Sequence, residues 1–298
     1  MPPKVTVLGA SGMLGHKIFQ RLRSTFPCTT AIMRRAKTSL PLRHIDLFQG
    51  SDVCDGIDCM NAELLQLTLA RIQPDFIVNC VGIIKQRPQA SDAVASIAIN
   101  ALLPHQLAAW AQAWGGRVIH FSTDCVFSGA RGSYIEEDAS DAHDLYGRSK
   151  FLGEVIAENA LTLRTSMIGR EIEEHRSLLD WFLAQKGRSV RGYRRVIYSG
   201  VTTNHLADLV SAIIEDHPEL SGLFQVVTSP ISKYDLLCLL RDAYSADIVV
   251  EPDDREVSDR SMLGNKLQRA IGYVAPSWSD LVQQLAADPT PYERWLSQ

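Results

Sequence analysis

The chain has 298 residues, of which 46% are hydrophobic and 21% are charged, and its formal net charge is -4. This composition is typical of a folded protein with a sizeable core, and it argues against nucleic acid as a partner. The length allows one large domain or two modest ones. No segment reaches the ~20 consecutive apolar residues that a membrane-spanning helix needs, so no membrane partner is expected.

The cysteines indicate the compartment. Their spacing forms neither a C-x-x-C pair nor a zinc-ligand pattern, and they stand at positions 28, 54, 59, 80, 125 and 238. The N-terminal segment has only a short apolar run before a glycine loop, unlike a signal peptide. We therefore expect free thiols, a cytoplasmic location and no metal site. The alternative is a divalent ion held by the mixed run at 170–176, which has acidic residues and a histidine.

In chain order, the first half alternates short β-branched runs with helical patterns. Strands are predicted at 4–9, 29–33, 43–46, 75–82, 117–122 and 161–166, and helices at 13–24, 61–72, 92–114 and 145–158. Nearly continuous apolar strands separated by amphipathic helices predict an α/β fold. The expected architecture is a doubly wound parallel sheet of the Rossmann type, covered on both faces.

After residue 166 the alternation becomes less regular. Helices are predicted near 177–185, 204–216, 231–244 and 279–287, with extended segments at 190–198, 223–227 and 247–252. We expect a sheet domain over 1–166 and a smaller lobe over 167–298. The helix at 204–216 is expected to pack back onto the sheet domain.

The first strand leads into a glycine-rich turn, "VTVLGASGMLGHKIFQRL". Gly9 suits a tight turn, Gly12 lets the backbone approach a pyrophosphate, and Gly15 permits close packing of helix on strand. The N–H groups that begin the following helix would bind the anion. The segment therefore predicts a dinucleotide site whose further contacts are Ser11, Met13 and Leu14.

The end of the second strand bears on cofactor choice. Arg34 and Arg35 stand where an acidic residue would favour NAD. Guanidinium groups suit a 2′-phosphate, which predicts NADPH as the cofactor, with NADH still possible. The alternative for this pair is a solvated basic loop.

Several short motifs span nearly the whole chain: "GASGMLG", "NCVG", "INALLPHQLA", "FSTDCVFSG", "YGRSKFLGE", "LRTS" and "SGVTTNHLADLV". Together they resemble the extended short-chain dehydrogenase/reductases, most closely the dTDP-4-dehydrorhamnose reductases. Tyr146 and Lys150 are spaced i and i+4, so they share one helix face.

The resemblance implies a site. Thr123, Tyr146 and Lys150 match the family's catalytic set: Tyr146 would donate a proton to a sugar carbonyl oxygen, and Lys150 would lower the pKa of the phenol. Thr123 would orient that oxygen. The further cofactor-binding residues would be Asp46, Leu47, Cys80, Val81, Gly82 and Asn100, in addition to Tyr146 and Lys150. Asn79 and Asn100 have a second interpretation, in which they satisfy buried backbone groups.

The residue after Asp124 distinguishes two reactions, reduction and dehydration. Related 4,6-dehydratases look like "STDEVYG", with an acid pair, whereas this chain has Cys125 at the glutamate position. A thiol is a poor replacement for a carboxylate base, so reduction is favoured over dehydration. Thr123, Asp124 and Cys125 are predicted to contact the substrate, with Arg191, Arg194 and Arg195 of "GRSVRGYRR" on its diphosphate. A solvated strand edge is an equal alternative for these arginines.

The function predicted from the sequence is NADPH-dependent reduction of the 4-keto group of a nucleotide-linked 4-keto-6-deoxyhexose. Residues 1–166 would hold the cofactor and residues 167–298 the sugar nucleotide. Two alternatives remain: a sugar-nucleotide epimerase, and a regulatory subunit similar to that of methionine adenosyltransferase. A homodimer stays open, since nothing in the sequence reports the oligomeric state.

Overall fold

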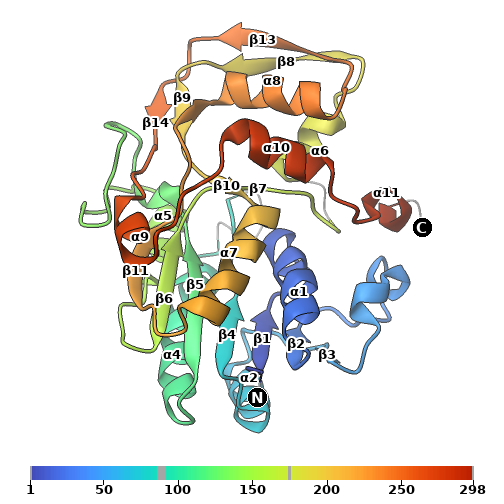
Figure 1. Cartoon of the computed structure of the whole chain (residues 1–298), viewed down its shortest axis with the longest axis vertical. Coiled ribbons are helices and arrows are strands. Elements are labelled where there is room, and N and C mark those ends of the chain that lie inside the picture. Colours follow the sequence, from blue (N-terminus) through green and yellow to red (C-terminus); the bar gives the residue numbers. More distant parts are fainter. Residues whose placement is uncertain (1, 86–91, 174–175, 297–298) are drawn as a thin grey trace.

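The computed structural model of the chain describes residues 2–85, 92–173 and 176–296. Its centre is a seven-stranded sheet in which every pairing is parallel and the order is β11-β6-β5-β4-β1-β2-β3 (Figure 1). The strands are β1 (Val5–Leu8), β2 (Thr29–Ile32), β3 (Val53–Cys54), β4 (Phe76–Asn79), β5 (Arg117–Ser122), β6 (Ala160–Arg164) and β11 (Gly222–Gln225). This order confirms the predicted doubly wound fold.

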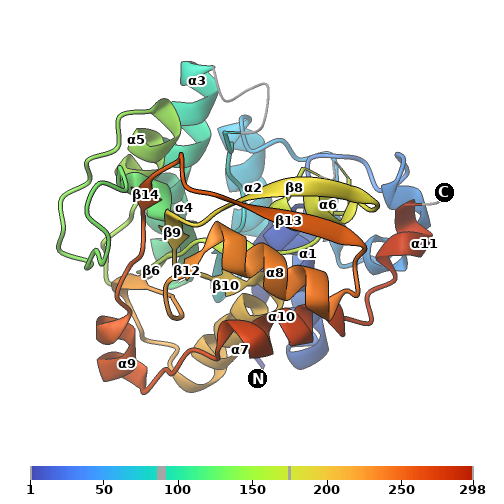
Figure 2. The ribbon, with the colours of Figure 1, turned by 90° about the horizontal axis from the view of Figure 1, so that it is seen from above.

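Helices cover both faces of the sheet, and nearly all residues of its central strands are buried (Figure 2). One face packs against α1 (Met13–Thr25) and α7 (Thr203–Asp216), which also contact each other. The other face packs against α2 (Ala62–Ile72) and α4 (Leu103–Gln112). The helix α5 (Leu145–Leu152) lies on this second side and carries the Tyr146 and Lys150 motif.

The smaller lobe contains three short sheets, and β8, β13 and α8 lie at the top of Figure 1, whereas α9 lies beside β11. Its strands are β7 (Met167–Ile168), β8 (Arg188–Tyr193), β9 (Val196–Tyr198), β10 (Val201–Thr202), β12 (Ile231–Ser232), β13 (Ile248–Asp253) and β14 (Ser258–Asp259). Its helices are α6 (Leu178–Leu183), α8 (Lys233–Ala243), α9 (Asn265–Ile271), α10 (Trp278–Ala286) and α11 (Tyr292–Leu296). β11 pairs with β6, so the chain returns to the main sheet after residue 166.

Two predicted elements are wrong in place or length. The segment at 43–46 is no strand: it lies in two 3₁₀ turns, Leu42–His44 and Asp46–Phe48. Its buried residues Leu42, Ile45 and Phe48 recur every third position, which is the 3₁₀ period and cannot alternate across a sheet. The predicted helix 145–158 ends with α5, where a Cβ on Gly153 would lie 1.9 Å from the carbonyl oxygen of Asn100.

The single helix predicted over 92–114 consists of three parts. A π-helical turn at Ile97–Leu102 separates α3 (Ala93–Ser96) from α4. By length and composition alone the run Ala93–Gln112 could cross a membrane. In the fold it is a core helix, because Leu103, Leu107 and Ala111 are buried against the sheet.

Candidate active site

The glycine loop joins β1 to α1 at the carboxyl edge of the sheet. Gly9 has φ +73°, and a Cβ on Gly15 would lie 2.0 Å from the carbonyl oxygen of Gly9, so only glycine fits there. α1 begins after Gly12 with no capping side chain and no acidic residue in its first turn. Its first N–H groups and their partial positive charge are therefore available to an anion.

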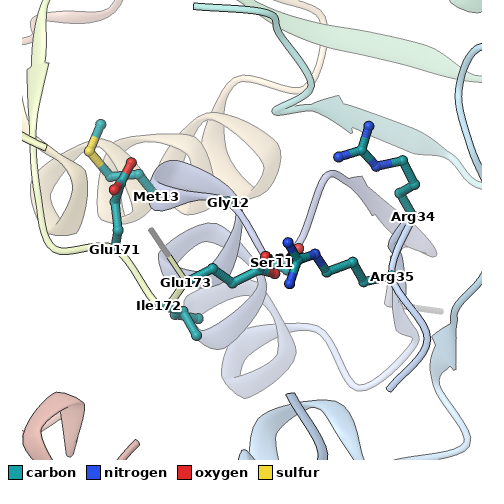
Figure 3. A pocket seen from close by; sticks show the side chains of 8 residues that line it. All are labelled: Ser11, Gly12, Met13, Arg34, Arg35, Glu171, Ile172 and Glu173. Carbon is teal, nitrogen blue, oxygen red and sulfur yellow. Dashed lines mark ion pairs between the residues drawn. The ribbon is translucent and has the colours of Figure 1, made fainter. Parts of the chain in front are cut away.

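A cavity of about 70 Å³ adjoins this helix end (Figure 3). It is lined by Ser11, Gly12 and Met13 of the loop, by Arg34 and Arg35 after β2, and by Glu171, Ile172 and Glu173 of the smaller lobe. Arg35 Nε lies 3.0 Å from Glu173 Oε2, whereas Arg34 points away from that carboxylate. The place of Glu173 at this cavity was not predicted, since nothing local indicates that the segment 170–173 reaches the glycine loop.

Two asparagines hold the backbone next to the loop. Asn79 accepts a hydrogen bond from the Val81 N–H at 3.1 Å. Asn100, in the π-helical turn, accepts from the Ile83 N–H at 2.8 Å and donates to the Ile83 carbonyl at 2.9 Å. Both side chains therefore satisfy buried backbone groups, as the second interpretation had it, and they shape the segment of Cys80, Val81 and Gly82. That segment touches Gly9, whose Cβ would meet Val81 at 3.0 Å.

Thr123, Asp124 and Cys125 follow β5 and form one hydrogen-bonded turn. The Thr123 hydroxyl donates to Asp124 Oδ1 and accepts from the Cys125 N–H, each at 3.1 Å. Burial raises the pKa of Asp124, and the Arg260 guanidinium opposes that rise. Burial and then the Asp124 carboxylate raise the pKa of Cys125 to about 12. Cys125 is therefore a neutral thiol at neutral pH and cannot act as a base.

Helix α5 brings Tyr146 and Lys150 to the same edge. Asp144 caps the helix by accepting from the Gly147 N–H at 2.9 Å, and it also pairs with Lys85, whose Nζ lies 5.8 Å from the Tyr146 ring centroid. The Tyr146 phenol interacts with the Thr123 hydroxyl. The structure thus brings Thr123 and Tyr146 together, as predicted.

The amine of Lys150 contacts β5. Its Nζ donates to the Phe121 carbonyl at 2.6 Å and lies 3.3 Å from His120 Nε2. Burial lowers the pKa of Lys150 to about 8, against the opposing charge of Glu154. Burial chiefly raises the pKa of Tyr146. The lowering of this pKa by Lys150 stays a prediction.

Two residues of the smaller lobe complete the rim, and sequence analysis missed both. Arg260 donates from Nε to the Phe127 carbonyl at 3.0 Å and from Nη2 to the Ser128 carbonyl at 3.2 Å. Its charge reaches Asp124, and the buried phenol of Tyr198 has its pKa raised by burial and by the same carboxylate. Neither belongs to a recognisable motif, because each reaches the site through tertiary contacts.

Other predicted contacts lie elsewhere. Arg194 forms an exposed ion pair with Asp254, and Arg191 Nε lies 4.0 Å from Asp253 Oδ2, so both side chains are exposed beside acidic residues. Arg195 flanks β9, and its carbonyl accepts from the Ser258 N–H.

Asp46 and Leu47 were predicted as cofactor contacts from the family resemblance, and they lie in and beside the segment 43–46, which was wrongly predicted as a strand. The Asp46 side chain is 90% exposed and lies 3.7 Å from Arg294, while Leu47 packs on the core. The third strand is β3, and Asp55 follows it, accepting from the Lys37 N–H at 2.7 Å.

Within residues 2–85, 92–173 and 176–296, no group of three His, Cys, Asp or Glu side chains is placed to hold a metal ion. Glu174 and His175 of the run at 170–176 lie outside the described residues.

The model of the family described as "RmlD substrate binding domain" matches residues 3–289. The chain belongs to this family. Among curated relatives, dTDP-4-dehydrorhamnose reductase of Burkholderia thailandensis is 39% identical over 170 residues, which are 55% of this chain and 50% of the relative. Methionine adenosyltransferase 2 subunit beta of Rattus norvegicus is 25% identical over 266 residues, covering 81% of this chain and 72% of the relative.

Solved structures confirm the fold of this family member. dTDP-4-dehydrorhamnose reductase of Bacillus anthracis, in complex with NADP, has a TM-score of 0.78 at 19% identity, with 96% of this chain and 99% of that chain covered. The Bordetella bronchiseptica enzyme WbmG, in complex with NAD and UDP, has a TM-score of 0.77 at 16% identity and covers 96% and 94%.

Proposed function

We propose that the chain is an NADPH-dependent reductase of the 4-keto group of a nucleotide-linked 4-keto-6-deoxyhexose. One observation carries the proposal: the glycine loop, the Thr123 and Tyr146 hydroxyl pair and Lys150 all lie at the carboxyl edge of one parallel sheet. Ligands of open α/β sheets bind at this edge. The solved structures of the same fold in complex with NADP and with NAD support the same cofactor class.

The cofactor would bind along the glycine loop. Its pyrophosphate fits the uncapped first turn of α1, where a side chain at Gly15 would push the turn away. Arg35 and Arg34 would hold a 2′-phosphate, and Lys150 the nicotinamide ribose. NADPH supplies a hydride to the sugar carbonyl carbon when it is bound.

Thr123 and Tyr146 would contact the carbonyl oxygen of the substrate. In this structure the Thr123 hydroxyl donates to Asp124 Oδ1, so its hydrogen would turn from that carboxylate to the substrate oxygen when the hydroxyl orients it. Tyr146 donates its proton to this oxygen as negative charge develops there. The high pKa of Tyr146 keeps the phenol protonated, and an ammonium at Lys150 moved toward the phenol would then ease proton transfer.

Arg260, Tyr198 and Lys85 surround the substrate side of this rim. A guanidinium held by two backbone carbonyls keeps further N–H groups for an anion, so Arg260 is our candidate for the diphosphate of the sugar nucleotide. We assign residues 167–298 to the substrate and the sheet residues before them to the cofactor, except that β11 and α7 return to the sheet domain.

The Cys125 thiol argues for reduction alone. Dehydration requires a base at the C5 proton and an acid at the C6 hydroxyl, and a thiol with a pKa of about 12 fills neither role at neutral pH. Purified protein should oxidise NADPH with a 4-keto-6-deoxy sugar nucleotide, and should release no water from the unoxidised hexose nucleotide with NADP⁺. Water loss seen by mass spectrometry would mean a dehydratase. A cofactor retained without net NADPH consumption would indicate an epimerase.

A second candidate is a regulatory subunit. It is favoured by the resemblance to methionine adenosyltransferase 2 subunit beta over 81% of the chain. Co-purification with a methionine adenosyltransferase catalytic subunit, together with failure to reduce any member of a panel of 4-keto sugar nucleotides, would establish this function instead.

A further inference from the structure

His120 is a fully buried histidine between the two halves of the site. It lies inside β5, with Asn79 of β4 on one side of its ring and Lys150 of α5 on the other. Asn79 Nδ2 lies 3.1 Å from His120 Nδ1, and Lys150 Nζ lies 3.3 Å from His120 Nε2. The side chains of Asn79, His120 and Lys150 thus form a row, which ends at the amine that the proposed chemistry uses.

The Asn79 amide has a defined orientation. Its Oδ1 accepts from the Val81 N–H, and only an oxygen can accept that bond. The amide nitrogen therefore faces His120 Nδ1 and donates to it. Burial lowers the pKa of His120 well below its usual range, so the ring is neutral. A neutral ring that accepts at Nδ1 carries its hydrogen on Nε2.

The Nε2–H group therefore points at Lys150. A donor in this position favours a free amine, which can accept the hydrogen bond, over an ammonium, which cannot. The effect acts in the same direction as burial. The Glu154 carboxylate opposes it but is itself neutralised by an ion pair with Arg164. His105 is the other ionisable group that acts on the histidine, and Tyr146 shares the helix with Lys150.

We propose that Asn79 and His120 are positioning residues that hold the Lys150 Nζ atom and set the balance between its ammonium and amine forms. This inference rests on the proposed function, because Lys150 matters through Tyr146. The amine is held against the strand by the Phe121 carbonyl and His120, and it can leave them to approach the phenol once protonated.

Nitrogen NMR of protein labelled at histidine rings and at lysine Nζ tests this without substrate. The native protein should show His120 as the Nε2–H tautomer and Lys150 titrating near pH 8. In Asn79→Asp, the new oxygen would accept from Nδ1–H and reverse the tautomer, leaving Nε2 to accept from an ammonium. The Lys150 midpoint should then rise by about one unit or more. His205→Gln, at a histidine bonded to Tyr273 instead, should leave it unchanged.

Turnover is the second readout. The high-pH decline of kcat/KM should follow the Lys150 midpoint upward in Asn79→Asp and in His120→Gln, whose amide oxygen can also accept from an ammonium. An Nδ1–H tautomer in the native protein, or an unmoved midpoint in both folded variants, would overturn the inference. If the protein reduces no sugar nucleotide, the proposed function fails, while the two NMR results still decide the roles of Asn79 and His120.

Discussion

Different interactions hold the two halves of the site: the glycine-loop edge, around Gly9 and Gly15, and the smaller-lobe rim, around Arg260. At the edge, backbone geometry dominates: Gly9 turns at positive φ, Gly15 touches a carbonyl, and asparagines bind main-chain groups. At the rim, side-chain contacts between distant segments dominate, as in the bonds of Arg260 to residues 127 and 128. The comparison teaches that the cofactor half is sterically fixed, whereas the substrate half can change by single side-chain substitutions.

The largest effect is expected at the proposed proton donor. Tyr146→Phe should lower turnover by roughly 10²–10⁴-fold, because it removes the proton donor while keeping the ring. NADPH binding, measured by fluorescence titration, should stay within about twofold. A variant that keeps most of its turnover would show that the proton comes from another group.

Arg260→Gln sharpens the comparison on the substrate side. We expect kcat/KM for the sugar nucleotide to fall about ten- to a hundredfold, the scale of one charged hydrogen bond, with unchanged NADPH affinity. The matched control is Arg194→Gln, at an exposed arginine paired with Asp254, which should have no effect. Equal losses in the two variants would remove the assignment of Arg260.

The Arg34→Ala/Arg35→Ala double variant tests the cofactor side. NADPH should bind about tenfold more weakly, and NADH should be little affected because it lacks the 2′-phosphate. Dissociation constants by calorimetry for both cofactors give the ratio. If the unmodified protein binds both equally, the solvated-loop alternative for these arginines is correct.

The smallest effect is expected at the ion pair between Arg35 and Glu173, which joins the cofactor half to the smaller lobe. Glu173→Gln removes the carboxylate paired with Arg35, so NADPH should bind a few-fold more tightly and NADH should not change. Weaker NADPH binding in this variant would show that Glu173 supports the cofactor site instead of competing with the phosphate for Arg35. Gln keeps the side-chain length and serves as the isosteric test.

The sequence predicts the half that is held by local backbone geometry better than the half that is held by contacts between distant segments. Glycine spacing and apolar runs are local, so the sheet, the loop and the Tyr146 helix were predictable. The 3₁₀ turns at 42–48 look like a strand because their buried residues are also apolar. Glu173, Tyr198 and Arg260 reach the site through the tertiary fold, which no local pattern reports. His120 had a signal, as a titratable residue within a buried strand.

Isotope labelling follows the proposed hydride transfer from NADPH to the sugar. NADPH carrying deuterium at the transferable position of its nicotinamide would be mixed with a 4-keto-6-deoxy sugar nucleotide, and the product sugar examined by mass spectrometry and NMR. The account predicts deuterium at carbon 4 of the product with the native protein, and at least a hundredfold slower labelling with Tyr146→Phe, roughly the scale of one general acid. A product without deuterium, or full-rate labelling in the phenylalanine variant, would contradict it.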